Sequence, residues 1–104
     1  MKFSINLSGK TLYSTMRQAG YSPALLKVET RKPGEQVFQR FLRGSRYPKF
    51  HVYAVPSTDN KSAELNLHLD QKQPSYKGSH AHNAEHDGQI VESEVSRIRS
   101  IFGA

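Results

Sequence analysis

The sequence predicts an α+β fold in a small single domain, with a three- to four-stranded antiparallel sheet packed by an N-terminal and a C-terminal helix. The chain has 104 residues, which is room for one domain with one modest core. Several stretches alternate apolar and polar residues, as strands do, and two others repeat apolar residues with the period of a helix. We expect the single domain to span residues 1–104.

The first elements are short. Apolar and polar residues alternate over residues 2–7, which is typical of a half-buried strand. Residues 11–19 space their apolar side chains by four and by three, and Gly20 follows where a helix C-cap is expected. Residues 21–23 are predicted to form a loop.

A hairpin is the clearest signal in the middle of the chain. Residues 35–42 fit both periods, but their aromatic content favours a strand. Residues 50–55 and 63–70 alternate strictly, and the intervening residues 56–61 carry the Pro, Ser, Asp and Asn typical of a turn. We therefore predict an antiparallel hairpin with one apolar face.

The polar face of this hairpin carries two histidines. If the leucines of residues 63–70 pack against the core, then His51, His68 and Asp70 lie on the opposite face. A register that pairs His51 with His68 is consistent with the alternation of both strands. The two imidazoles are expected to be cross-strand neighbours.

Apolar residues recur from Val91 to Phe102 at intervals of four, three and four, which predicts a C-terminal helix. Asp87 or Gly88 is placed to cap its start. We expect the charged side chains of the helix to face water, namely Glu92, Glu94, Arg97 and Arg99.

Composition narrows the possible chemistry and location. The chain has no cysteine, which excludes a disulfide framework and a thiolate zinc site, so any zinc must take His, Asp or Glu ligands. No apolar run approaches the roughly 20 residues that span a bilayer, and the N-terminus lacks the apolar core of a secretory signal. We expect a cytoplasmic protein without a membrane partner.

The net charge of +6 is unevenly distributed. Residues 1–52 carry ten Lys or Arg against two Glu, whereas residues 53–104 carry five basic and seven acidic residues. A basic first half with interleaved aromatics favours nucleic acid, RNA or DNA, as partner. The candidate nucleic-acid-binding residues are Arg40, Arg43, Arg46, Tyr47, Lys49 and Tyr53.

Histidines and carboxylates concentrate in one stretch. Four of the five histidines lie within residues 68–88, most of which form a long polar loop over residues 70–88. Imidazole and carboxylate groups bind divalent metals such as zinc, or act as an acid–base pair without metal. The candidate metal ligands are His68, Asp70 and His82, with His51, His80, Glu85 and His86 as further candidates.

Short motifs within this stretch resemble those of known metal-dependent families. Residues 82–86 match the H-x-x-E-H arrangement of inverted zinc metallopeptidases, but Gly88 would end such a helix at once. Residues 79–88 are similar to the H-x-H-x-D-H motif of metallo-β-lactamases, which are about twice as long, and His80-Ala-His82 resembles the histidine pair of rolling-circle endonucleases without their tyrosine. A site built from the hairpin and the loop together is the remaining interpretation.

Two resemblances extend over more of the chain. The order helix, three strands, helix is that of the double-stranded-RNA-binding domain, although this chain lacks that family's lysines at the start of its last helix. The runs 47–53, 67–72, 74–76 and 81–82 resemble a group of small bacterial proteins with no known activity. The second resemblance implies that five residues belong together as one group, namely His51, His68, Asp70, Tyr76 and His82.

Three functions follow from these patterns as expectations. Nucleic-acid binding through the basic first half is the leading one, and a metal-dependent hydrolase or nuclease centred on the His/Asp residues is the alternative. A protein-interaction module is the third. The residues alone do not decide whether the protein is an enzyme.

Overall fold

A computed structural model of the chain describes residues 1–24, 34–42, 48–70, 84–85 and 88–102. It confirms the α+β class with two helices. The elements follow in the order β1 (Lys2–Asn6), α1 (Leu12–Gln18), β2 (Ser22–Pro23), β3 (Gln36–Phe41), β4 (Lys49–Pro56), β5 (Ser62–Asp70), β6 (Ala84–Glu85) and α2 (Gln89–Phe102). Within these residues, neither helix is long and apolar enough to cross a membrane.

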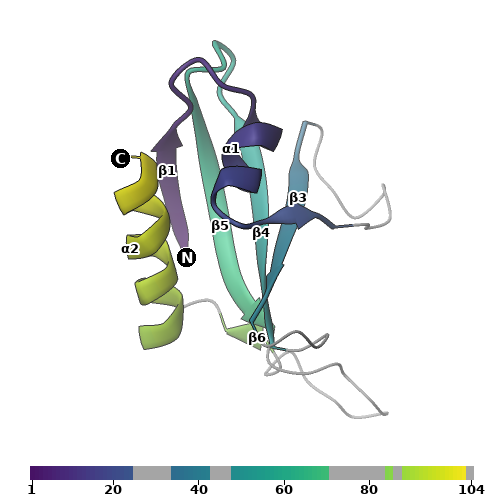
Figure 1. The fold of residues 1–104 in the computed structure, drawn as a ribbon, viewed down its shortest axis with the longest axis vertical. Coiled ribbons are helices and arrows are strands. Elements are labelled where there is room, and N and C mark those ends of the chain that lie inside the picture. Colours follow the sequence, from purple (N-terminus) through teal and green to yellow (C-terminus); the bar gives the residue numbers. More distant parts are fainter. Residues whose placement is uncertain (25–33, 43–47, 71–83, 86–87, 103–104) are drawn as a thin grey trace.

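The strands form one sheet in the order β1-β5-β4-β3-β2, and β6 pairs with the end of β5. Every pairing is antiparallel. In Figure 1, α1 lies in front of β4 and β5, and α2 runs alongside β1. The predicted strand at residues 35–42 is confirmed as β3.

The sheet has more strands than the three or four expected from the sequence. Residues 22–23, expected in a loop, form β2 against β3, and residues 84–85, inside the predicted loop 70–88, form β6 against β5. Two residues are too few to show a period, because alternation needs at least four. Both strands are defined by backbone pairing with a strand from another part of the chain, which the local sequence does not show.

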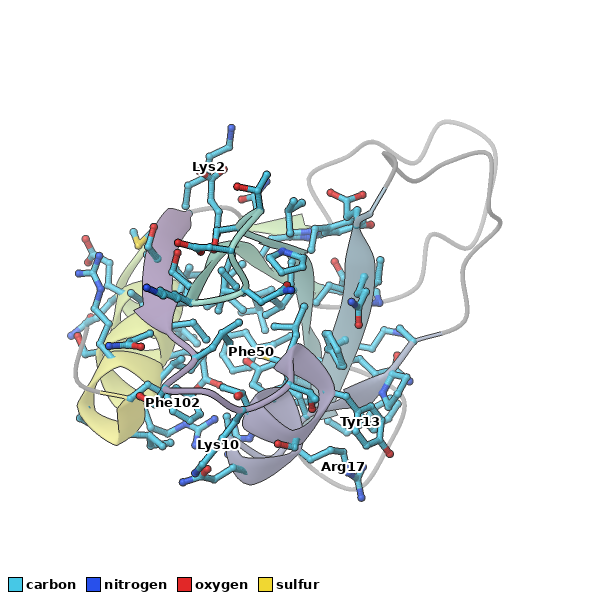
Figure 2. All side chains as sticks on the ribbon, turned by 90° about the horizontal axis from the view of Figure 1, so that it is seen from above. Lys2, Lys10, Tyr13, Arg17, Phe50 and Phe102 are labelled. Carbon is cyan, nitrogen blue, oxygen red and sulfur yellow. The ribbon has the colours of Figure 1, made fainter. Side chains whose placement is uncertain are left out.

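Both helices cover the same face of the sheet. The strands bury alternate residues on that face, including Leu65, Leu67 and Val52, none of which is measurably exposed. These side chains form one core cluster with Met16 of α1 and Ile98 of α2. Figure 2 shows the two helices on one side of the sheet. The opposite face of the sheet carries no described helix.

Local hydrogen bonds set the ends of α1 and the hairpin turn. The Thr11 hydroxyl caps α1 by accepting from the Ser14 amide at 3.1 Å, and Gly20 follows with φ +93°, a conformation that favours glycine. Between β4 and β5, the Asp59 carboxylate accepts from the Lys61 amide at 3.0 Å. This turn closes the hairpin in a single register.

The expectation that Glu94 faces water is wrong, whereas Arg97 is partly exposed, with 35 % of its side chain accessible. The side chain of Glu94 is 5 % exposed and accepts from the buried Tyr21 hydroxyl at 2.6 Å. The guanidinium of Arg97 donates to both Glu94 oxygens at 2.8 Å and to the Ala19 carbonyl at 2.7 Å. Arg40 of β3 lies 3.6 Å from the same carboxylate. A charged network therefore joins α2 to β3 and the end of α1.

The network also keeps Tyr21 protonated. Burial raises the pKa of the Tyr21 phenol, and the adjacent Glu94 carboxylate raises it further, so that the pKa lies far above its usual range. The phenol is therefore a hydrogen-bond donor at any physiological pH. The Glu94 carboxylate has Tyr21, Arg97 and Arg40 as partners, and these contacts offset most of the free-energy cost of burying an unpaired charge.

We predict that Glu94→Gln lowers the free energy of unfolding by about 2–4 kcal/mol, because it leaves Arg97 and Tyr21 with a neutral partner. Urea denaturation measures this difference. The matched control is Glu92→Gln on the exposed side of the same helix, which should cost less than about 1 kcal/mol. Equal losses in the two variants would contradict a structural role for the buried carboxylate.

Candidate metal centre

The pairing of β4 with β5 assembles a group of polar side chains on the face of the sheet opposite the helices. His51 pairs with His68, as the sequence predicted, and Lys49 pairs with Asp70. Residues two apart on a strand share a face, so Asp70 and His68 point to the same side. We call this the histidine face and define it by His51, Tyr53, Asn66, His68 and Asp70.

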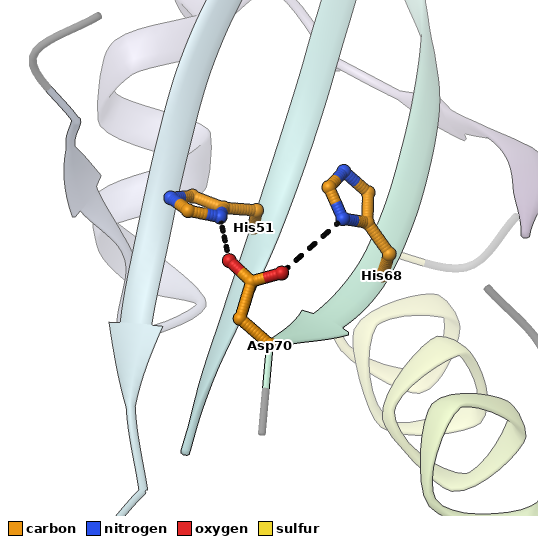
Figure 3. A group of neighbouring side chains, drawn as sticks. All are labelled: His51, His68 and Asp70. Carbon is orange, nitrogen blue, oxygen red and sulfur yellow. Dashed lines mark ion pairs between the residues drawn. The ribbon is translucent and has the colours of Figure 1, made fainter. Parts of the chain in front are cut away.

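Three of these side chains converge. One carboxylate oxygen of Asp70 contacts Nδ1 of His51, and the other lies 3.7 Å from Nδ1 of His68. Figure 3 shows the carboxylate between the two imidazoles, with one oxygen directed at each ring. The three side chains are only 12–17 % exposed. They form a compact, largely buried group with a small part of its surface accessible to solvent.

The histidines keep Asp70 ionised. Burial alone would raise the pKa of the Asp70 carboxyl, but the hydrogen bonds and positive charge of His51 and His68 together outweigh it. The pKa therefore lies well below its usual range, and the carboxylate is negative at any physiological pH. An ionised carboxylate and two imidazoles are ready-made metal ligands.

Tyr53 completes one side of the group. Its ring stacks on His68 with an interplanar angle of 14° and a centroid separation of 5.1 Å. The ring centroids of His51 and His68 are 5.9 Å apart. Burial, with a smaller effect of Asp70, raises the pKa of the Tyr53 phenol. Tyr53 therefore restrains the His68 ring and keeps a protonated hydroxyl near it.

The donor atoms meet the spatial requirement for an ion. One ligand atom from each of His51, His68 and Asp70 lies within 4.8 Å of the other two. Zinc bonds of about 2.0–2.2 Å place tetrahedral ligand atoms about 3.3 Å apart. Side-chain rotations that bring the donor atoms closer together, by up to about 1.5 Å, would accommodate one zinc ion.

The structure brings together only part of the predicted metal site. His68 and Asp70 are joined by His51, which was a further candidate. His80, His82 and His86 lie outside the described residues. Glu85 lies in β6, with its backbone paired opposite Leu69. Loop ligands beyond these three therefore stay predictions.

The structure describes three of the predicted nucleic-acid-binding residues, and these three do not share one face of the sheet. Lys49 and Tyr53 lie on the side of β4 that carries His51, whereas Arg40 pairs with the buried Phe50 and points to the helix side. Arg40 is engaged by Glu94 in the charged network. The remaining three candidates, Arg43, Arg46 and Tyr47, lie outside the described residues.

His51, a further candidate in the predicted metal site, lies as close to Asp70 as a direct contact. Three signals on the chain identify it: the alternation of residues 50–55, the predicted pairing with His68, and the His-x-Asp spacing that puts Asp70 on the same face. The role of Tyr53 beside His68 had a similar signal, since Tyr53 is two residues from His51.

No family model, no curated protein and no solved structure matches this chain. The geometry of the centre is therefore the basis for the function proposed below.

The depressed pKa of Asp70 gives a pH dependence with a defined sign. A carboxyl whose folded-state pKa is lowered contributes stability above its unfolded pKa of about 3.9, and this contribution is lost as the pH falls through the folded pKa. We predict that the parent protein is more stable than Asp70→Asn at about pH 5 and that the difference shrinks towards about pH 2. Urea denaturation of metal-free protein measures it. A difference independent of pH would contradict the ion pairing.

Proposed function

We propose that this protein binds a divalent transition-metal ion, with zinc as the reference, through His51, His68 and Asp70, and uses it to activate water for hydrolysis. The convergence of three donor atoms within 4.8 Å is the observation that carries the proposal. The side chains come from paired strands rather than from a long loop, so their separation is set by the sheet.

The donor set suits a reactive centre. Two neutral imidazoles and one carboxylate are the ligands of several hydrolytic zinc sites, in which the fourth position holds water. A bound divalent ion lowers the pKa of that water towards 7 and so supplies hydroxide at neutral pH. With three protein ligands, a fourth position on a tetrahedral ion would be left for water.

A metal explains the arrangement better than a metal-free acid–base pair does. An acid–base pair needs one imidazole oriented by one carboxylate oxygen. Here both oxygens of Asp70 face an imidazole, and both imidazoles present Nδ1. All three groups are used at once when they surround a single ion.

We predict that isothermal titration calorimetry of the metal-free protein shows one zinc ion bound per chain. His51→Ala, His68→Ala and Asp70→Asn should each weaken binding by at least about 10-fold, since each removes a ligand. Saturating zinc should also raise the melting temperature of the parent and not that of Asp70→Asn.

The matched control is Glu64→Gln, which removes one exposed carboxylate from the same face of the same strand. It should leave zinc affinity within about two-fold of the parent, because Glu64 pairs with Val55 at the far end of the hairpin. Absence of zinc binding, or an equal loss in Glu64→Gln and Asp70→Asn, would refute the centre. The His82→Ala variant tests separately whether the predicted loop histidine adds a ligand.

A further inference from the structure

We infer that the substrate class of this centre is single-stranded nucleic acid, held with a phosphodiester at the metal, its phosphates near Lys49 and a base on Phe41. The inference rests on the proposed metal centre and names what it acts on. Neither the metal-ligand geometry nor the charge of the chain alone specifies this substrate.

Lys49 and Phe41 lie in line with the centre. Phe41 of β3 pairs with Lys49 of β4, and Lys49 in turn pairs with Asp70 of β5. These three residues therefore form one row across the histidine face. The Lys49 ammonium lies 5.7 Å from the centroid of the Phe41 ring. A cation and an aromatic ring thus adjoin the metal ligands on one side.

The charge of the loaded centre favours an anion. A divalent ion with Asp70 ionised and both imidazoles neutral carries one net positive charge, and Lys49 adds a second beside it. A phosphodiester complements this charge, whereas a peptide bond or a neutral ester does not. The adjacent ammonium would also offset negative charge that develops on phosphorus-bound oxygens during the reaction.

The exposed aromatic ring points to unpaired bases. Phe41 is 43 % exposed and lies on the same face of the sheet as Lys49 and Asp70. Aromatic rings on an open sheet face stack on bases that are not paired in a duplex, and neighbouring lysines contact the backbone phosphates. On the other side of the centre, the Tyr53 hydroxyl is available as a hydrogen-bond donor.

The hydrolysis balances without a further reactant. The oxygen of water forms a new bond to phosphorus, and the bond from phosphorus to the leaving sugar oxygen breaks. The leaving oxygen takes a proton that originates from the attacking water. No oxidant or reductant is required.

Fluorescence anisotropy of a labelled oligothymidylate of about 12 nucleotides, titrated with zinc-loaded protein, tests the inference. We expect Lys49→Gln to weaken binding at least about five-fold, since it removes a phosphate contact. Phe41→Leu should weaken it by a similar or larger factor, because base stacking on an aromatic ring is lost. The same oligonucleotide annealed to its complement should bind more weakly than the single strand.

Lys10→Gln is the matched control, since it removes the same charge from the helix side of the molecule, where Lys10 contacts Gln18 (Figure 2). It should change the affinity less than two-fold. Equal losses for Lys10→Gln and Lys49→Gln, equal affinity for single strand and duplex, or no binding at low salt would each overturn the inference.

A zinc titration of Lys49→Gln separates this inference from the proposed function. If the parent binds zinc but does not bind the oligonucleotide, the substrate class is rejected and the metal centre is retained. If the parent does not bind zinc, the metal centre itself is rejected. Cleavage of the labelled strand, followed by gel electrophoresis with Asp70→Asn as the inactive comparison, provides the readout of the reaction.

Discussion

The register between β4 and β5 is the constraint on which the centre depends. A shift by one residue would move His51 or His68 to the opposite face, because side chains alternate along a strand. The buried leucines of β5 resist such a shift, since it would expose them to water. The hydrophobic core on one face therefore holds the donor atoms in place on the other.

Each face of the sheet carries one carboxylate with several partners. On the helix side, Glu94 joins Tyr21, Arg97 and Arg40 in a charged network that ties α2 to the rest of the fold. On the histidine face, Asp70 joins two imidazoles near solvent. Both carboxylates are surrounded by cationic or hydrogen-bonding groups. Glu94 is only 5 % exposed, so its contacts stabilise the fold.

The sequence predicts much of this arrangement where a pattern is long. Residues 50–55 and 63–70 alternate over enough positions to predict the hairpin, its apolar face and the pairing of His51 with His68. It could not predict β2 and β6, because a two-residue strand has no period. Glu94 was misjudged because helical spacing places it beside Val95 on the buried stripe, while its charge suggests a surface position.

The candidate site was predictable only where its residues lie on one strand. Spacing along one strand placed His68 and Asp70 together, but the choice between His51 and a loop histidine as third group requires the distance across the sheet. Similarly, Arg40 and Lys49 are close in sequence yet lie on opposite faces, because the alternation of two paired strands separates them. The number of basic residues in a segment therefore does not show on which face of the sheet each of them lies.

The most direct test of the account is anomalous diffraction at the zinc absorption edge from crystals of the zinc-loaded protein. The account predicts one strong anomalous peak within about 2.0–2.2 Å of Nδ1 of His51, Nδ1 of His68 and a carboxylate oxygen of Asp70. A peak bound elsewhere on the chain, or none between these three side chains at full zinc occupancy in solution, would contradict it.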